Sequence, residues 1–162
     1  MGKILLPEVT LIAVTSVDLE ATIRAMERSC RGIQFGAIKL FSPEKIKSDF
    51  IEYEWIKIDS IDLIGYNRFV MEKLGVHIET SHCLVTQADG FVSNHLYWKD
   101  SYLEYDYVGA PWPKESRINA VMTHARVPKP NFLKKHGFNG HESRSICRKM
   151  TVFTPRVDFW AH

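Results

Sequence analysis

Apolar positions in the first part of the chain show a strand pattern followed by a helix pattern. Residues 9–15 are apolar on both faces of an extended chain, which is typical of a strand in a parallel sheet that is covered on both sides. Between residues 19 and 30 the apolar positions recur every three or four residues, which predicts a helix with one buried face. Ser16 or Asp18 can cap the start of this helix, and Gly32 lies where its C-terminal cap is expected.

Predicted strands and helices continue as far as residue 87. Residues 35–42 and 51–58 are predicted strands, and apolar and acidic residues alternate in the second of them. A second helix is expected to begin at Asp59 or Ser60, and residues 82–87 form a further predicted strand. The inward face of the second helix is predicted to carry Leu63, Tyr66, Val70 and Leu74. This order predicts an α/β fold with a Rossmann-like, mostly parallel sheet flanked by helices.

Beyond Gly109 the periodic pattern weakens. Residues 109–116 contain two prolines and a glycine and are predicted to form a loop, whereas residues 142–150 again have a helical pattern. The 162 residues suit one domain with a sizeable core, so a single domain spanning residues 1–162 is expected.

Composition and charge are those of an ordinary globular protein, with 45% hydrophobic and 25% charged residues. The formal net charge of +2 is too balanced to indicate a nucleic-acid partner. Nine Lys or Arg residues nevertheless lie between residues 114 and 149, where Glu115 and Glu142 are the only acids. This stretch is either a solvated basic surface or a wall that attracts a phosphate-bearing ligand.

Cysteine usage and the start of the chain bear on location. Cys30, Cys83 and Cys147 form no Cys-x-x-Cys pair, so neither a zinc ribbon nor a disulfide scaffold is indicated. Cys83 lies in a predicted strand and is expected to be a small core residue. The first residues lack the apolar stretch of a signal peptide, and no transmembrane run is present, so a cytoplasmic protein is expected.

The last predicted strand ends in a segment with possible ligand chemistry, Gln-Ala-Asp-Gly-Phe at residues 87–91. Asp89 follows this strand, and ligands of open α/β sheets bind at the carboxyl ends of strands. Its carboxylate could ligate Mg²⁺ or Mn²⁺, and Gly90 could let the backbone approach a ligand closely. Asp-Gly is also a common turn dipeptide, and local chemistry alone favours the turn.

A longer segment resembles a known pattern. Residues 87–112 carry, in order, Gln-Ala-Asp-Gly-Phe, an Asn, a Trp and Tyr-Asp-Tyr-Val-Gly-Ala-Pro-Trp. They resemble a family of bacterial glycosyltransferase-like proteins of unknown detailed function, often encoded among surface-polysaccharide genes. Residues 7–42 and 60–74 fit the same family in order and spacing, so the resemblance covers residues 7–113. That family is similar to nucleotide-sugar-dependent transferases of the glycosyltransferase-A fold.

The resemblance implies a donor site at the ends of two strands. It places a divalent cation, Mn²⁺ or Mg²⁺, at Asp89, where it would neutralise the nucleoside diphosphate that leaves during sugar transfer. Thr15 and Ser16 would contact the nucleotide, although both also fit a helix start. The other positions that the resemblance assigns to the donor are Gln87, Gly90 and Arg117. The implied partners are a nucleotide-sugar donor and a glycan acceptor.

Aromatic residues near the end of the resembling segment allow two interpretations. Tyr105, Tyr107 and Trp112 could line an acceptor-sugar surface, or they could pack in the core or at its rim. Asp106 is either a polar site residue or a solvated surface acid. Asp106 is therefore not assigned a catalytic role.

The chain departs from the family pattern after Trp112. Ala120 and Val121 stand where the family has paired glycines, and Ser143 stands where it has the second residue of an acidic pair. Glu142 is then the carboxylate left to act as general base on an acceptor hydroxyl. His141 or His162 could complete the metal site.

Two functions from different classes follow from these patterns. The first is a metal-assisted glycosyltransferase whose residues 7–113 form a donor-binding half, with a divergent acceptor half at residues 114–162. The second is a catalytically inactive module that binds a carbohydrate or another partner. A nucleotide-binding protein of another α/β type is disfavoured because the sequence has no Gly-rich phosphate loop.

Overall fold

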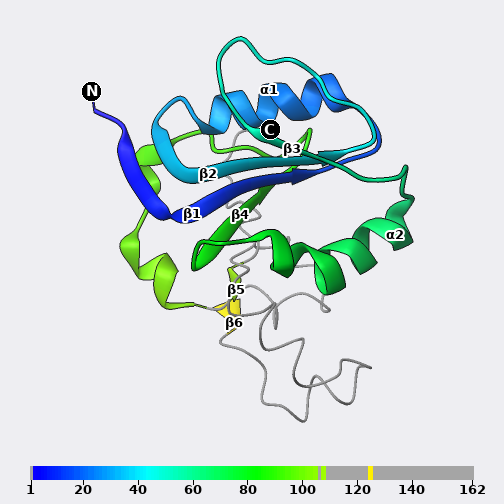
Figure 1. Cartoon of the computed structure of the whole chain (residues 1–162). Helices are drawn as coiled ribbons and strands as arrows, with labels where there is room; N and C mark the ends of the chain where they lie inside the picture. Colours follow the sequence, from blue (N-terminus) through cyan, green and yellow to red (C-terminus); the bar gives the residue numbers. More distant parts are fainter. Residues whose placement is uncertain (1, 106, 109–123, 126–162) are drawn as a thin grey trace, which may run out of the picture.

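The computed structural model describes residues 2–105, 107–108 and 124–125. Its centre is a four-stranded parallel sheet in the order β3-β2-β1-β4, with helices on both faces (Figure 1). The strands are β1 (Ile4–Val14), β2 (Ile33–Ser42), β3 (Glu54–Lys57) and β4 (His82–Thr86). The predicted α/β fold with a Rossmann-like parallel sheet is therefore confirmed.

Two helical segments cover the opposite faces of this sheet (Figure 1). Helix α1 (Leu19–Ser29) connects β1 to β2 and covers one face. Helix α2 (Leu63–Arg68) continues as a π-helical turn, η1 (Phe69–Lys73), and a 3₁₀ turn, η2 (Leu74–His77), and this segment covers the other face. Parallel neighbours require such crossover connections, because a tight hairpin cannot join them.

The remaining described elements are short. After β4 come two 3₁₀ turns, η3 (His95–Tyr97) and η4 (Asp100–Glu104). Strand β5 (Tyr107–Val108) pairs in the antiparallel sense with β6 (His124–Ala125). The helix predicted at residues 142–150 lies outside the described residues. Among the residues that the structure describes, no helix has both the length and the apolar character needed to cross a membrane.

Strand β1 is buried on both faces, as its sequence predicts. Leu11 and Ala13 belong to the core between the sheet and α1 (the α1-side core), and Ile12 and Val14 belong to the core under α2 and η1 (the α2-side core). The strand begins before the predicted residue 9, because Ile4 to Leu6 already pair with β2. The pairing then shifts register between Leu6 and Thr10.

Helix α1 has the predicted buried stripe, but its ends differ from the prediction. Ile23, Met26 and Cys30 are buried in the α1-side core. Asp18 occupies the N-cap position, yet its left-handed backbone leaves its side chain without a capping hydrogen bond. The C-cap is Cys30 rather than Gly32, whose carbonyl instead accepts a hydrogen bond from the N–H of Ile4 at 2.9 Å.

The second helical segment begins later than predicted. Asp62 caps α2 by accepting a 2.7 Å hydrogen bond from the N–H of Gly65, so neither Asp59 nor Ser60 starts the helix. Val70 and Leu74 are buried and Tyr66 packs against them as predicted, but the Leu63 side chain is 74% exposed. Phe69, the first residue of the π-helical turn, is buried as well.

The predicted alternation in residues 51–58 is confirmed on its apolar side. Ile51, Tyr53 and Trp55 all pack against the α1-side core, although only Glu54–Lys57 forms the strand. Cys83 is buried in the α2-side core, as expected of a small core residue. The apolar pattern therefore identified the buried side chains more accurately than it identified the strand boundaries.

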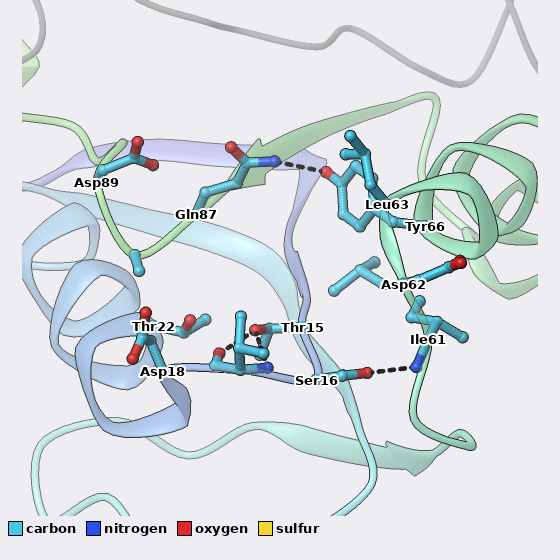
Figure 2. Close-up of a pocket in the computed structure, with 13 residues that line it drawn as sticks. Thr15, Ser16, Asp18, Thr22, Ile61, Asp62, Leu63, Tyr66, Gln87 and Asp89 are labelled. Atoms are coloured by element: carbon cyan, nitrogen blue, oxygen red, sulfur yellow. Dashed lines mark hydrogen bonds between the residues drawn. The ribbon is translucent and has the colours of Figure 1, made fainter.

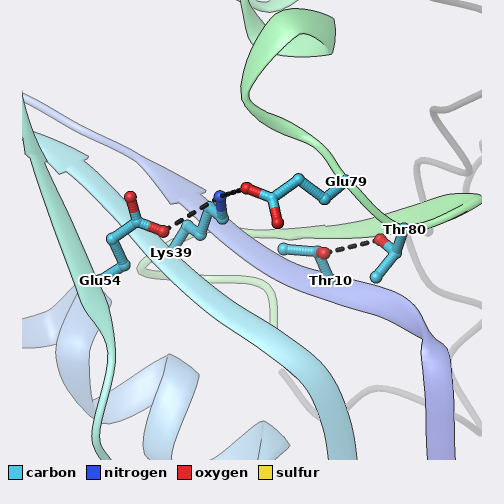
Figure 3. Close-up of polar contacts among 5 residues, drawn as sticks. All are labelled: Thr10, Lys39, Glu54, Glu79 and Thr80. Atoms are coloured by element: carbon cyan, nitrogen blue, oxygen red, sulfur yellow. Dashed lines mark hydrogen bonds and ion pairs between the residues drawn. The ribbon is translucent and has the colours of Figure 1, made fainter.

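One buried charge lies on the sheet face covered by α2. The side chain of Lys39 on β2 is almost fully buried, and its Nζ lies 3.0 Å from Glu54 and 3.4 Å from Glu79 (Figure 3). Beside it, the hydroxyls of Thr10 and Thr80 are hydrogen-bonded at 2.6 Å. Burying an ammonium group is tolerated when opposite charges and hydrogen bonds compensate the lost hydration.

A substitution at Gly36 tests the close contact between β1 and β2. A Cβ atom at this position would lie 2.1 Å from the carbonyl oxygen of Pro7, and this backbone atom cannot rotate away. We expect Gly36→Ala to lower the free energy of unfolding by about 1–3 kcal/mol, measured by urea denaturation. Gly90→Ala is the control, because a Cβ there meets nothing within 4 Å and should leave stability almost unchanged. Equal effects of the two substitutions would contradict this account.

Cys30 makes stability depend on alkaline pH. Burial of its thiol raises the pKa from 9.0 to about 11, with Lys3 lowering it and Glu27 raising it further. Because the folded pKa lies above the unfolded one, the contribution of the neutral thiol is complete below pH 9 and is lost as pH rises towards 11. We expect urea denaturation of the wild type to show a larger loss of stability between pH 8 and pH 10.5 than Cys30→Ala, by about 2 kcal/mol. Parallel losses in both proteins would refute this role of Cys30.

Candidate functional site

A cleft lies at the carboxyl ends of β1 and β4 (Figure 2). The chain runs from β1 outward through β2 to β3 and then returns to place β4 on the other side of β1, so the strand order reverses between β1 and β4. Ligands of open α/β sheets bind at such a switch point. The cleft has a volume of about 520 Å³, and we call it the carboxyl-edge cleft. Its walls come from residues 14–18 with Thr22, residues 61–63 with Tyr66, and residues 87–89.

Thr15 and Ser16, which were predicted to contact a nucleotide, both line this cleft. The hydroxyl of Thr15 donates to the carbonyl of Val17 and accepts a 3.2 Å hydrogen bond from the N–H of the same residue. The hydroxyl of Ser16 accepts a 2.8 Å hydrogen bond from the N–H of Ile61 (Figure 2). Ser16 therefore joins the loop after β1 to the loop before α2 and does not cap α1.

Asp18 is a residue of this cleft that the sequence suggested only as a helix cap. Its φ of 48° is the only positive value found for a residue other than glycine in the part of the chain that the structure describes. Such a backbone costs free energy and persists mainly where its surroundings or a function require it. The exposed Asp18 carboxylate makes no capping bond and lines the cleft. No sequence signal distinguishes this role from capping.

Thr22, in the first turns of α1, is a second residue that sequence reasoning missed. Its side chain is only 1% exposed and lines the cleft, and within the described residues its Oγ1 has no hydrogen-bond partner. Buried hydroxyls nearly always have a partner, so an orphaned one in a cleft wall calls for an explanation. A bound ligand that accepts or donates a hydrogen bond at this wall would supply the missing partner.

The segment after β4 forms the turn that local chemistry favours. Gln87 and Gly90 exchange backbone hydrogen bonds of 3.0 and 3.1 Å, with Ala88 and Asp89 between them. No described protein atom lies close to the missing Cβ of Gly90, and Gly90 does not line the cleft. The structure thus gives no support to the expectation that Gly90 allows a close approach of a ligand. The turn does place the exposed Asp89 at the cleft, so the turn interpretation and a site at Asp89 are compatible.

Gln87 fixes the end of β4 relative to α2. Its Nε2 donates a 2.8 Å hydrogen bond to the hydroxyl of Tyr66 (Figure 2). Burial raises the pKa of Tyr66 above its ordinary value, and the hydrogen bond from Gln87 lowers it in part. Both side chains line the cleft, so this bond holds its two walls together.

The cleft has two carboxylates on one side and mainly apolar side chains on the other, where Asp62 caps α2. Asp18, Asp62 and Asp89 line it, and none of the described lining residues is Lys or Arg. Figure 2 shows Asp18 and Asp89 on the side of α1, with Leu63 and Tyr66 opposite. This arrangement suits a ligand that carries a cation or hydroxyl groups at one end and an apolar or aromatic group at the other.

The carboxylates of the cleft decide what kind of cation site the chain could form. The described residues contain no group of three or more His, Cys, Asp or Glu side chains that could hold a metal ion by themselves. A Mg²⁺ ion bound with a nucleotide needs only one or two carboxylates, because phosphate oxygens and waters complete its octahedron. Asp89, with Asp18 on the same side of the cleft, fits this second kind of site.

Several predicted site residues are not among the residues that the structure describes. Arg117, Glu142, His141 and His162 lie outside the described residues. So do Asp106 and Trp112, whereas Tyr107 lies in β5. Tyr105 is half-buried and packs against the α1-side core, which favours its packing interpretation over an acceptor surface.

Thr22 allows a direct test of the unsatisfied hydroxyl. Thr22→Val has nearly the same shape and removes the orphaned polar atom, so we expect the free energy of unfolding to rise by up to about 1 kcal/mol. Thr10→Val is the matched control, because Thr10 is equally buried but bonded to Thr80, and it should lose stability. Urea denaturation of both variants without ligand checks this, and a loss of stability in Thr22→Val would contradict the assignment.

Comparison with known proteins gives one match. Residues 45–149 match the family described as "Protein of unknown function (DUF5672)", so the match includes α2, β4 and the turn that carries Asp89. No curated protein and no solved structure matches the chain. Because the family covers more than half of the chain, this protein belongs to the DUF5672 family of unknown function.

Proposed function

We propose that this protein is a glycosyltransferase, which transfers a sugar from a nucleotide-sugar donor to a glycan acceptor with the help of a divalent cation. The observation that carries the proposal is the position of the carboxyl-edge cleft, at the switch point of a parallel sheet with Asp89 on its wall. The resemblance of residues 7–113 to glycosyltransferase-like proteins supports the same function. The proposal includes a glycosyltransferase-A-like arrangement in a single domain, and a cytoplasmic location.

Electrostatics explain why a cation belongs to this proposal. A diphosphate that entered the cleft would face Asp18 and Asp89 without a basic side chain among the described lining residues. Like charges a few Å apart repel strongly where water is partly excluded. A divalent ion between Asp89 and the diphosphate would convert this repulsion into attraction. When bound, it would also neutralise the charge that develops on the departing nucleoside diphosphate.

The protein's own side chains have distinct roles in this proposal. The apolar side chains of Ile61 and Leu63 would pack against the nucleoside and exclude water from one side of it. The orphaned hydroxyl of Thr22 would hydrogen-bond the donor. Glu142, outside the described residues, remains the proposed general base.

A second candidate function is a module that binds the donor or a glycan without catalysing transfer. The observation in its favour is the sequence after Trp112, where Ala120, Val121 and Ser143 replace residues of the family pattern. Loss of paired glycines would hinder close approach to a donor sugar, and loss of an acid would weaken proton abstraction. Neither effect would remove the proposed contacts of the nucleotide in the cleft.

Asp89 is the residue to test first. We expect UDP- or GDP-sugar with Mn²⁺ to raise the melting temperature of the full chain, because a ligand that binds only the folded state stabilises it. Asp89→Asn should abolish this shift while preserving the size of the side chain. Asp49→Asn, which alters an exposed aspartate outside the lining of the cleft, should leave the shift unchanged.

The results separate the candidates. No shift across a panel of nucleotide sugars with Mn²⁺ or Mg²⁺ would refute donor binding and with it the transferase, and would leave only the module that binds a glycan. A shift that depends on Asp89, together with release of nucleoside diphosphate in the presence of glycan acceptors, is expected of the transferase. The same shift without release of nucleoside diphosphate would favour the binding module.

A further inference from the structure

A second cavity lies at the other end of α1, away from the carboxyl-edge cleft. It has a volume of about 280 Å³ and lies between the C-terminal end of α1 and the chain that follows β4. Its lining residues are Arg28, Ser29, Arg31, Gly32, Phe91, Val92, Ser93 and His95. We call it the basic cavity. Because the 11 residues of α1 span about 16 Å, the two sites are well separated along the helix.

The wall of the basic cavity is held by a buried hydroxyl. Ser29 is almost fully buried, and its Oγ donates a 2.9 Å hydrogen bond to the carbonyl of Ala25. The same oxygen accepts a 3.0 Å hydrogen bond from the N–H of Val92. Both bonds are buried, so they fix the segment after β4 against the last turn of α1.

His95 is held against a glycine. A Cβ atom at Gly32 would lie 2.0 Å from Nδ1 of His95, so the imidazole occupies the space that any other residue at position 32 would fill. The carboxamide oxygen of Asn94 accepts a 3.0 Å hydrogen bond from the N–H of Leu96 and fixes the start of η3. The close contact explains why the sequence has glycine here, although Gly32 does not cap the helix.

The cavity concentrates cationic side chains without acidic ones. The guanidinium of Arg28 lies 4.8 Å from the centre of the Phe91 ring, which orients its planar face. Neither Arg28 nor Arg31 has an ion-pair partner among the described residues, and no Asp or Glu lines the cavity. Arg24 on the same helix differs, because it pairs with Glu20 at 3.5 Å.

The helix dipole accounts for only part of this arrangement. A basic residue near the C-terminus of a helix is stabilised by the partial negative charge there, which explains one arginine. It does not explain a second arginine, an imidazole seated against glycine and a hydroxyl from Ser93 around the same cavity. Two guanidinium groups supply forked N–H donors that match the tetrahedral oxygens of a phosphate group.

We propose that the basic cavity binds a phosphate group, with Arg28, Arg31 and His95 as its main contacts. This site is independent of the proposed transferase function, because it shares no residue with the carboxyl-edge cleft. The phosphate is free inorganic phosphate, a soluble phosphate ester or the headgroup of a lipid. Leu96 and Tyr97, both exposed, directly follow His95 and provide an apolar surface for the last of these.

The test is an NMR titration of the ¹⁵N-labelled full chain with sodium phosphate, compared with sodium chloride at equal ionic strength. We expect saturable shifts of the backbone amides at residues 28–32 and 91–95 with phosphate alone. Arg31→Ala and Arg28→Lys should each weaken binding by about tenfold, as expected for loss of a charged hydrogen bond. Arg24→Ala is the matched control and should bind as the wild type does.

Each outcome decides the proposal. Shifts that do not saturate, that chloride reproduces, or that survive unchanged in both Arg28→Lys and Arg31→Ala would overturn it. Asp89→Asn should bind phosphate normally, so failure of the proposed transferase function leaves this result unaffected.

Tighter binding of glucose 1-phosphate than of phosphate would identify a soluble ester. Binding to phosphatidic acid vesicles but not to phosphatidylcholine vesicles would identify a headgroup, and binding of phosphate alone would identify the free ion.

Discussion

Burial of β1 on both faces is the constraint on which the rest of the structure depends. The strand has a parallel neighbour at each edge, and its side chains alternate between the two cores, so it is surrounded on four sides. Parallel pairing requires crossover connections, which carry α1 over one face and α2 with η1 over the other. The loops after β1 and β4 then meet at the carboxyl edge, and their meeting creates the cleft.

Charge compensation differs along the molecule, and the difference marks the two candidate sites. The buried ammonium of Lys39 has two carboxylates within ion-pair distance, so it needs no ligand. Asp18 and Asp89 line the carboxyl-edge cleft without a basic neighbour in its described lining, and the arginines of the basic cavity have no acidic one. A phosphate-bearing ligand would therefore need a bound cation in the carboxyl-edge cleft, at the start of α1. It would need none in the basic cavity, at the C-terminal end of α1. The DUF5672 family itself has no assigned function.

Much of the fold followed from periodicity because periodicity reports which faces are buried. The two-sided apolar run predicted β1, the three-and-four spacing predicted α1, and the alternation in residues 51–58 predicted which side chains reach the core. Helix boundaries were predicted less well, because capping depends on backbone angles that sequence only biases. Asp18 illustrates this, since a good capping residue adopts a left-handed backbone that turns its side chain away.

The sequence by itself determined the order of strands and helices along the chain, the two-sided burial of β1 and the presence of an acid just after β4. Only the tertiary structure decided what those residues face. The cleft brings Thr22 and Leu63 together with residues 87–89, from segments far apart in the chain. The contact of His95 with Gly32 likewise joins distant segments. Local patterns record which side chains avoid water, whereas a site is made by residues that the fold brings together from distant strands.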